Sequence, residues 1–507
     1  MLASLRTAAI VGIDACPVHV EVDVSFGLPS FKMVGLPDAS VRESRDRVKS
    51  AIRNSGFEFP PHRITVNLAP ADVRKAGASF DLPIALGILA AAGIVERRHV
   101  VDLVLLGELS LDGSIHPTRG VLPVAIGARR DGVAGILLPS QNASEAAIVS
   151  GLVVIPVASL IEAVRAMNDP RSVAADVVPP APRHAVDTLD LADVRGQLLA
   201  RRALEVAAAG GHNLLLVGPP GSGKTMLAQR LAGVLPPLTF DEALEVTAIH
   251  SVAGLLPAGA GIFSERPFRA PHHTISTAAL VGGGSQPRPG EVSLAHHGVL
   301  FLDEMLEFTR NVLEVLRQPV EEGSVTVARA ARSAMFPARF MLVGAMNPCP
   351  CGFYGDNTRS CLCSPPQIAR YRSRLSGPLR DRLDMTVEVP ALSIDAMQDA
   401  GGEPTAAVRA RVVAARDRQA ARYAAAPMRT NAALTPSLLA RHCQLTPSAH
   451  RILSAAARRL SLSARAYDRV RKVARTIADL DGVDAIAGDH VAEALQFRMP
   501  TTALPAG

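Results

Sequence analysis

Short runs of Val, Ile and Leu alternate with Ala-rich stretches along the first third of the chain. Such runs predict β-strands that lie among helices, and the candidates are Val18–Val24, Ile64–Leu68, Leu103–Leu106, Ile136–Pro139 and Val153–Val157. The mixture persists to about Ala166. We therefore expect an α+β N-terminal domain over residues 1–168.

A different pattern follows a Pro-rich segment. Residues 169–188 contain four prolines and few large apolar side chains, which predicts an exposed linker. Within residues 189–392, the runs Leu214–Val217, Val299–Leu302 and Phe340–Ala345 are short and apolar. Such runs are typical of parallel strands buried on both faces. Because they alternate with helical stretches, a doubly wound α/β domain is the predicted fold.

The last part of the chain, residues 393–507, is rich in Ala and Arg and reads as helical. Pro436 and Pro447 punctuate it, and the final helices are expected over Ser463–Leu480 and Gly488–Gln496. We predict a helical C-terminal domain that follows the α/β domain.

Composition and charge change this picture little. The chain has 507 residues, of which 48% are hydrophobic and 20% charged, as in ordinary globular proteins of about three domains. A net charge of +6 permits nucleic-acid binding but equally fits an ordinary surface. The N-terminus has no signal-peptide pattern, and no window has the length and apolarity needed to span a bilayer. We expect a cytoplasmic protein with no membrane partner.

A complete phosphate-binding loop follows the predicted strand Leu214–Val217. Glycines let backbone N–H groups turn towards phosphates, and the helix that follows adds the positive end of its dipole. Lys224 supplies charge for the β- and γ-phosphates, and the Thr225 hydroxyl can ligate Mg²⁺. The sequence therefore predicts an ATP and Mg²⁺ site at Gly218, Pro219, Pro220, Gly221, Ser222, Gly223, Lys224 and Thr225.

Polar residues also end two further apolar strands. Val299–Leu302 runs into Asp303 and Glu304, and Met341–Ala345 is followed closely by Asn347. An Asp-Glu pair alone is a weak signal, but beside a glycine loop it matches the site of P-loop ATPases. Asp303 would hold Mg²⁺ and Glu304 would polarise the attacking water. Asn347 would reach the γ-phosphate or this water.

Arginines follow the third of these strands. The segment Ser376–Asp384 contains Arg380 and Arg382, and one of them could stabilise transition-state charge on a neighbouring subunit's nucleotide. In isolation, a surface salt-bridge cluster would explain them better.

Segments along nearly the whole chain resemble the magnesium-chelatase-like AAA+ proteins, and within them the YifB/ComM family. Besides the glycine loop they are Gly196–Gln197, Ala209–Asn213, Phe268–Thr274, Pro289–Glu304, Asn347–Gly352 and Ala474–Leu480. The resemblance implies a homo-hexameric ring that hydrolyses ATP. For the ComM branch it implies a DNA helicase that drives branch migration during recombination of incoming DNA.

The resemblance also implies roles for single residues. The arginine finger falls on Arg382, although Arg380 stands where the family pattern has Leu and competes for the role. The sensor arginine of the helical lid would be Arg465, with Arg469 as the alternative. The residues implied to lie near the adenine are Val194 and Gln197.

Two N-terminal segments, Lys75–Ser79 and Gly107–Gly113, resemble the proteolytic domain of Lon. Ser79 matches the nucleophile there, but the spacing of the motifs puts the position of the catalytic Lys at about Leu122. The nearby Arg119 is too basic to replace a Lys. Because a Ser without a base is not a nucleophile at neutral pH, we expect a Lon-protease-like fold without peptidase chemistry.

Four of the six cysteines, Cys349, Cys351, Cys361 and Cys363, crowd into one short segment. Two Cys-x-Cys pairs across a short loop can converge on a tetrahedral Zn²⁺. The spacing is tighter than in the usual Cys-x-x-Cys knuckles, and four reduced thiols are the alternative. We favour a structural zinc that shapes the loop after Asn347. Contacts around the site or at an interface, rather than a second metal, are expected of His272, His273, His296 and His297.

Residues Gly323–Arg339 have the pattern of a β-hairpin, with Arg329 and Arg332 near its turn. In ring helicases of similar build a hairpin at this point enters the central pore, so these two arginines are candidates for phosphate contacts. Gly282–Arg288 is a candidate second pore loop. Solvated surface arginines explain the same residues equally well.

The sequence is compatible with several functions. The leading hypothesis is an ATP-driven translocase on single-stranded or branched DNA. The first alternative is a chelatase-type motor that drives metal insertion into a tetrapyrrole through partner subunits. A Lon-like peptidase is opposed by the missing Lys, and a passive zinc-containing DNA-binding ring by the intact pair Asp303 and Glu304.

Overall fold

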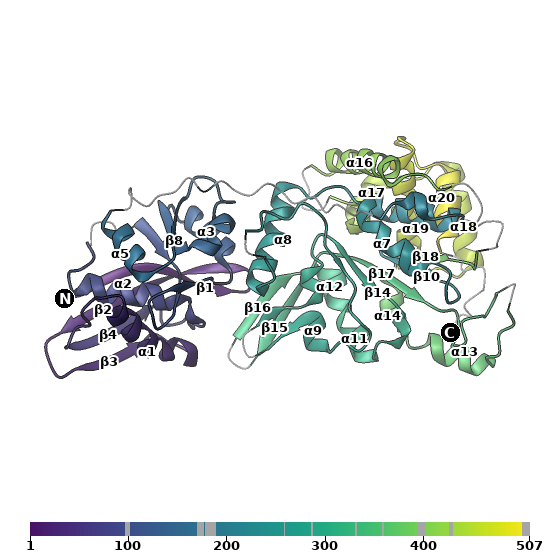
Figure 1. Ribbon diagram of the computed structural model, residues 1–507. Coiled ribbons are helices and arrows are strands. Elements are labelled where there is room, and N and C mark those ends of the chain that lie inside the picture. Colours follow the sequence, from purple (N-terminus) through teal and green to yellow (C-terminus); the bar gives the residue numbers. More distant parts are fainter. Residues whose placement is uncertain are drawn as a thin grey trace. The chain divides into compact units, whose positions relative to one another are not determined.

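The computed structural model describes residues 1–96, 102–169, 177, 189–257, 259–284, 287–329, 332–356, 359–392, 401–424 and 429–498 (Figure 1). The chain divides into two compact units. The first comprises Met1–His184 and Phe240–Ser264, and the second comprises Ala185–Thr239 and Glu265–Gly507. The predicted linker lies almost wholly outside the described residues.

The first unit is built on a seven-stranded mixed sheet of order β3-β4-β2-β1-β5-β8-β9. Strands β1 and β2 form a long antiparallel hairpin, β4 pairs antiparallel with β2, and the remaining neighbours are parallel. The five predicted strands are confirmed, since each overlaps one of the observed strands. These are β1 (Leu2–Val11), β2 (Asp14–Ser25), β3 (Ser30–Val34), β4 (Arg63–Ala69), β5 (Leu103–Leu105), β8 (Gly135–Pro139) and β9 (Val153–Val157).

Helix α2 (Asp81–Ala91) lies at the centre of this unit, and every one of its residues is buried. A helix that is apolar all round must be covered on all sides, and α2 contacts the β1–β2 hairpin and α1 (Ala39–Asn54). Its first residue, Asp81, accepts hydrogen bonds from the Arg47 guanidinium at 2.7 and 3.0 Å. The pairing satisfies a buried carboxylate that would otherwise be costly.

A segment from the middle of the predicted α/β domain belongs to this first unit. Helix α8 (Phe240–Ala253) packs against α3 (Val121–Arg130). The Ser251 carbonyl accepts a hydrogen bond from the Gly120 amide at 3.3 Å, and its hydroxyl donates to the buried Glu145. The sequence pattern gave no sign of this insertion.

The second unit contains a parallel five-stranded sheet of order β11-β14-β17-β10-β18. Helices α6 (Leu198–Gly210) and α7 (Lys224–Val234) cover it together with other connecting helices. The predicted doubly wound α/β fold is confirmed. Its strands are β10 (Leu214–Val217), β11 (Phe268–Arg269), β14 (Val299–Leu302), β17 (Met341–Met346) and β18 (Met385–Glu388).

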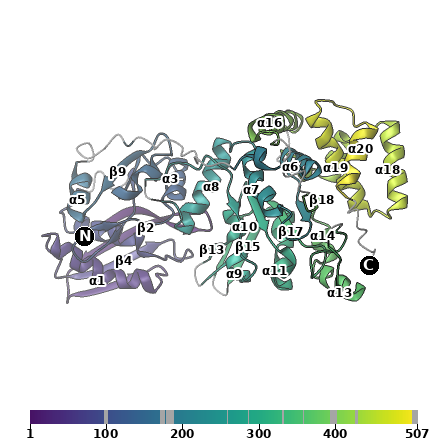
Figure 2. The ribbon, with the colours of Figure 1, turned by 45° about the vertical axis from the view of Figure 1, so that its right-hand side comes forward.

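The helical region shares one hydrophobic core with this sheet. Figure 2 shows its helices as a bundle beside α6 and β18. Buried side chains of α16 and α19, such as Val412 and Val473, belong to the same cluster as Val206 and Leu214. This helical region, which runs from α16 to α20 and is called the lid below, is therefore an integral part of the second unit. Its helices are α16 (Thr405–Arg422), α17 (Pro436–His442), α18 (Pro447–Arg459), α19 (Ala464–Leu480) and α20 (Gly488–Gln496).

None of the described helices combines the length and the apolar character that a bilayer-spanning segment needs.

Candidate nucleotide site

The glycine loop, the carboxylate pair and Asn347 meet at one edge of the parallel sheet. The loop follows β10, the pair follows β14, and Asn347 follows β17, which lies between these two strands. Parallel strands bring their carboxyl ends to the same edge, where ligands bind in open α/β sheets. At the first loop position only glycine fits, since a Cβ atom at Gly218 would lie 2.1 Å from the Val389 carbonyl oxygen.

Lys224 is held at the centre of the loop. Its ammonium donates to the carbonyl oxygens of Gly218 and Pro219, both at 2.8 Å, and to Oδ1 of Asn347 at 3.3 Å. Burial lowers the pKa of Lys224, while the charges of Asp303 and Glu304 oppose that shift. The Lys224 ammonium thus lies among the backbone groups of the glycine loop, where a bound phosphate requires a positive charge.

Thr225 and Asp303 form the pair that would hold Mg²⁺. The Thr225 hydroxyl donates to Oδ2 of Asp303 at 2.7 Å. These two oxygens therefore lie side by side next to the glycine loop. The other carboxylate oxygen of Asp303 accepts from the Glu304 amide at 2.9 Å. Hydroxyl and carboxylate oxygens are the ligands that Mg²⁺ prefers, and this pair fits such an ion.

Glu304 has a histidine neighbour, one of the four for which the sequence predicted contacts around the site or at an interface without naming a partner. Its backbone is left-handed, with φ of 49°, and its carboxylate lies 3.8 Å from Nδ1 of His273. His273 follows β11, whose carboxyl end lies at the same sheet edge because β11 pairs in parallel with β14. The His273 ring also packs on that of His272, with centroids 4.1 Å apart. In the sequence, the signal that could have pointed to this contact is the position of His273 shortly after β11, a strand of the parallel sheet.

Gln197 links the loop to the end of the sheet. Its side-chain amide donates to the Pro390 carbonyl at 2.7 Å and to the Ser222 carbonyl at 3.4 Å. Val194, the other residue implied near the adenine, is completely buried in the core. Of these two, only Gln197 has a described polar contact with the glycine loop.

Two of the candidate arginines, Arg382 and Arg469, lie at the opposite, amino edge of the sheet. The Asn213 side chain donates to the Arg382 carbonyl at 2.9 Å, and Asn213 immediately precedes β10. Arg469 lies 3.4 Å from Asp384, which immediately precedes β18. A four-residue strand spans about 13 Å, which separates this edge from the glycine loop. Arg465, in the first turn of α19, is exposed.

Arg382 is already paired within its own chain. Its guanidinium donates to the Glu321 carboxylate and, at 2.7 Å, to the Pro378 carbonyl. Arg380, the competing candidate, is exposed. On exposure alone Arg380 is the more accessible of the two to another molecule.

The four cysteines converge as their spacing suggested. Sγ of Cys349 lies 3.4 Å from that of Cys351 and 3.7 Å from that of Cys361, and the last two are 3.6 Å apart. The Cys363 sulfur completes the group and accepts a hydrogen bond from the Cys351 amide at 3.4 Å. Tetrahedral zinc with Zn–S bonds of about 2.3 Å would separate its sulfurs by about 3.8 Å. The donor set therefore fits such an ion closely.

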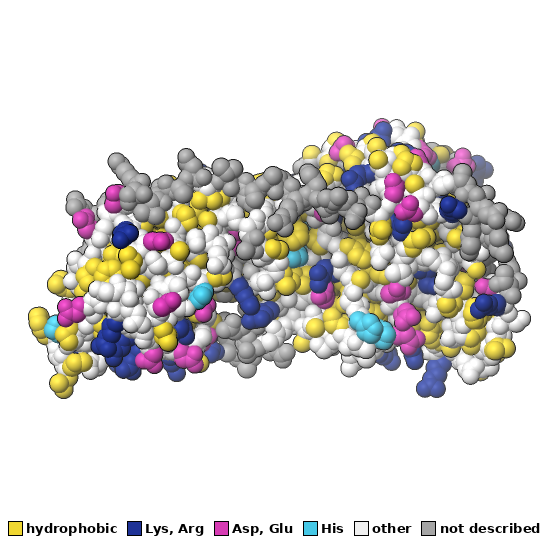
Figure 3. All heavy atoms as spheres, viewed as in Figure 1, with side chains coloured by type: hydrophobic (Ala, Val, Ile, Leu, Met, Phe, Trp, Pro, Cys, Tyr) yellow, Lys and Arg dark blue, Asp and Glu magenta, His cyan; other side chains and the backbone are white. Residues whose placement is uncertain are grey.

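The predicted hairpin is present as β15 (Ser324–Arg329) and β16 (Arg332–Pro337), which pair antiparallel with Arg329 opposite Arg332. The side chains of these two arginines lie outside the described residues. A second short hairpin joins β12 (Gly282–Gly283) to β13 (Arg288–Pro289), at the other candidate pore loop. On the face shown in Figure 3, basic and acidic side chains are interspersed, in keeping with the mild net charge.

The Lon-like motifs of the first unit do not assemble a described proteolytic dyad. Ser79 lies in a short 3₁₀ turn (Ala78–Phe80), and Leu122 is buried in α3 with its amide bonded to Glu145 at 2.9 Å. The buried Lys75 donates instead to the Pro70 carbonyl. None of these contacts gives Ser79 a base.

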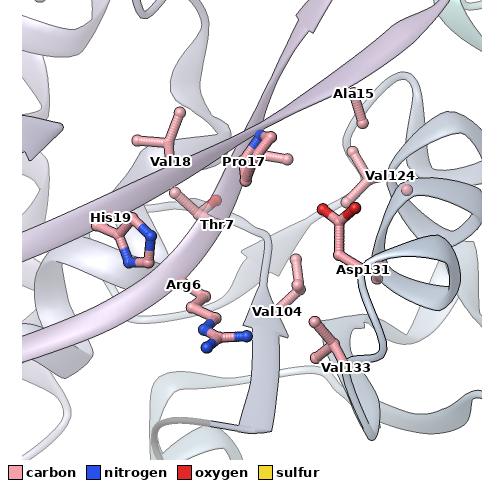
Figure 4. A pocket seen from close by; sticks show the side chains of 13 residues that line it. Arg6, Thr7, Ala15, Pro17, Val18, His19, Val104, Val124, Asp131 and Val133 are labelled. Carbon is pink, nitrogen blue, oxygen red and sulfur yellow. The ribbon is translucent and has the colours of Figure 1, made fainter. Parts of the chain in front are cut away.

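A cavity of about 220 Å³ also lies in the first unit, between β1, β2 and α3 (Figure 4). Its walls are mainly apolar, and the buried hydroxyl of Thr7 has no hydrogen-bond partner among the described residues. None of the predicted site residues lines this cavity.

Together, the loop geometry and the strand-end carboxylates are those of P-loop ATPases, and the helical lid after the sheet narrows the class to AAA+ proteins that bind ATP with Mg²⁺. Comparison with known proteins agrees. Residues 190–397 match the family described as magnesium chelatase, subunit ChlI, residues 20–142 match the subunit ChlI of Mg-chelatase, and residues 402–498 match its C-terminal part.

Full-length relatives define the family more narrowly. The chain is 45% identical over 504 residues to the competence protein ComM of Haemophilus influenzae, covering 98% of this chain and 97% of that protein. It is 44% identical over 505 residues to the uncharacterized protein YifB of Salmonella typhimurium, with the same coverage. The chain belongs to the YifB/ComM family of magnesium-chelatase-like AAA+ proteins.

The similarity to Lon is partial. The Lon protease of Chloroflexus aurantiacus is 28% identical over 184 residues, which cover 34% of this chain and 22% of that protein.

Proposed function

We propose that this protein is an ATP-hydrolysing ring motor that moves along single-stranded or branched DNA and promotes branch migration in homologous recombination or DNA uptake. The observation that carries the proposal is the complete hydrolytic site of Lys224, Thr225, Asp303 and Glu304, since a passive DNA-binding ring would not need it. The name of the ComM relative, a competence protein, supports the link to DNA uptake.

Each residue of the site has a part in hydrolysis. Lys224 neutralises the β- and γ-phosphates, and Thr225 and Asp303 would hold the Mg²⁺ that supplies further positive charge. Glu304 orients and polarises the attacking water, and Asn347 contacts either that water or the γ-phosphate. His273, 3.8 Å from the Glu304 carboxylate, positions this base.

The arginines at the amino edge support a ring. About 13 Å of strand separate Arg382 from the glycine loop of its own chain, which favours its action on the nucleotide of a neighbouring copy, while Arg469 stays the alternative to Arg465 as the lid sensor. We assign Arg382 as the finger that stabilises transition-state charge, with Arg380 as the competing residue, and Arg465 as the lid sensor. Binding of a neighbour would then release Arg382 from Glu321. We take a homo-hexamer as the size of this ring, as the family resemblance implies.

DNA would be held by positive charge near the ring pore. Arg329 and Arg332 are the candidates on the β15–β16 hairpin, where the strand register sets them opposite each other. Arg310, Arg370 and Arg374 line an open hollow of about 480 Å³ in the same unit, together with Glu307, which pairs with Arg374 at 3.0 Å. Such groups neutralise phosphates without reading sequence, so binding should weaken steeply with salt.

The cysteine cluster would hold a structural Zn²⁺, because four protein thiolates fill a tetrahedral site and leave no open position. The amide of Phe353 lowers the pKa of the Cys351 thiol to about 6, whereas burial and the neighbouring thiols raise the pKa values of Cys361 and Cys363, so Cys351 is the thiol of these three that is readiest to bind metal. The N-terminal unit serves assembly or substrate contact rather than proteolysis.

The decisive experiment measures ATP hydrolysis by the purified full-length protein, alone and with single-stranded or branched DNA, beside Glu304→Gln. We expect DNA to stimulate turnover and Glu304→Gln to abolish it while nucleotide binding persists. Turnover that ignores every DNA substrate would refute the DNA motor. It would then favour a chelatase-type motor, in line with the 29% identity over 162 residues to a magnesium-chelatase subunit of Chlorobaculum parvum.

A further inference from the structure

The loop that carries the four cysteines, Cys349 to Cys363 (the cysteine loop), is in direct contact with the glycine loop, Gly218 to Thr225. The backbone of Gly352, between Cys351 and the rest of the loop, lies against the ring of Pro220. A Cβ atom at position 352 would lie 2.5 Å from Cδ and 2.9 Å from Cγ of that proline. Real Cβ atoms do not approach other atoms this closely, so glycine is required here for the two loops to touch.

A second connection runs through the end of β17. Asn347, whose Oδ1 accepts from the Lys224 ammonium at 3.3 Å, is two residues from Cys349 in sequence. The intervening Pro348 carbonyl accepts from the Arg372 side chain at 3.0 Å. The cysteine cluster is therefore joined to the phosphate site both by a stretch of three residues, Asn347 to Cys349, and by a packing contact.

The other described contacts of the cysteine loop are at its surface, where the guanidinium groups of Arg372 and Arg359 lie 5.0 and 5.2 Å from the ring centroids of Tyr354 and Phe353. Among its described residues only Cys349 and Gly352 are buried, while Leu362 is 90% exposed and Tyr354 is 37% exposed. A loop with so few buried apolar groups has a low local stability of its own. Its conformation then depends on what joins its four sulfurs, and bound metal stabilises such a loop by linkage.

We propose that the cysteine cluster controls nucleotide affinity: with metal bound, the loop holds Pro220 and Asn347 in the geometry that receives ATP, and metal loss releases both and weakens ATP binding. This rests on the zinc site proposed above and is independent of DNA. Gly352 and Pro220 are positioning residues that act through the glycine loop. The arrangement makes metal supply, or any reagent that captures the thiols, a regulator of the motor.

The first test compares metal-loaded and metal-stripped full-length protein. Zinc content is measured with a chromogenic chelator after thiol release, and affinity with a ribose-labelled fluorescent ATP analogue in excess Mg²⁺ and reductant. We expect about one zinc per chain and a Kd that rises about five-fold or more on stripping and returns on zinc addition. Absence of zinc would refute the metal site itself. Bound zinc with an unchanged Kd after stripping would refute only its control of the nucleotide.

The second test keeps the metal and disturbs the contact. In Gly352→Ala the new Cβ must displace Pro220, and overpacking of this kind costs enough to raise the Kd about five-fold or more. Pro220→Ala removes both clashing atoms, so the double variant should bind like Pro220→Ala alone. Gly132→Ala is the matched control, because Gly132 is also left-handed, with φ of 70°, but has nothing within 4 Å of a Cβ. Equal affinities of the double variant and Gly352→Ala, with zinc retained, would overturn the packing route.

Discussion

The packing of the lid helices against one another depends on one buried carboxylate, Asp479 of α19. It is wholly inaccessible and accepts hydrogen bonds from Arg422 at 2.6 and 2.9 Å, from Arg475 at 3.1 Å and from Asn431 at 2.8 Å. Arg475 itself is only 2% exposed. Asp479→Ala would leave that guanidinium without its counter-charge inside the core.

Removal of one partner of a buried ion pair costs about 3–5 kcal/mol. Arg475 keeps two backbone acceptors, the carbonyls of Val483 and Asp484, so the lower end of that range applies. We therefore expect a loss of about 3 kcal/mol in the free energy of unfolding of the second unit. For a unit of this size, with an unfolding entropy of about 2 cal/mol/K per residue, the loss lowers Tm by about 5 °C.

Thermal unfolding followed by circular dichroism, with urea titration in parallel, measures this change. Asp468→Ala is the matched control on the same helix, because Asp468 is 42% exposed and its ion pair with Arg471 spans 3.5 Å. Such surface pairs contribute under about 1 kcal/mol. If Asp479→Ala cost no more than Asp468→Ala, the buried network would not hold the lid helices together. Adding Arg475→Met to Asp479→Ala should recover much of the loss.

Four further predictions concern the site and its surroundings. Lys224→Ala should abolish binding of a fluorescent ATP analogue, while circular dichroism stays unchanged. Arg382→Ala and Glu304→Gln should each lack ATPase activity, but their mixture should regain part of it if the finger acts between subunits; an inactive mixture of assembled rings would contradict this. Burial would raise the pKa of Asp384, but His212, Arg469 and the Asn213 amide outweigh it and lower that pKa. Asp384 thus adds stability above about pH 4 that is lost as the pH falls through the folded pKa, so Asp384→Asn should flatten the acid limb of urea-unfolding curves. Ser79→Ala should leave ATPase activity and DNA binding unchanged, and any peptidase activity lost with it would refute a non-proteolytic unit.

The phosphate-binding chemistry could be read from the sequence because it is local. Gly218–Thr225 needs only a strand before it and a helix after it, and the apolar runs on either side supply both. The same holds for Asp303 and Glu304 after β14 and for Asn347 after β17. The cysteine cluster was also local, since all four sulfurs lie within fifteen residues. The DNA contacts and the roles of Arg382 and Arg465 stay predictions.

What the sequence determined by itself is therefore the class of site, because residue type and spacing along one strand and loop fix which groups can meet a phosphate or a metal. Only the tertiary structure decided which distant residues contact one another. His273 meets Glu304 across neighbouring strands, α8 leaves the α/β domain to pack on α3, and Gly352 touches Pro220. These contacts join residues far apart in the chain. They depend on strand order and on close packing in three dimensions, which no periodicity along a single segment encodes.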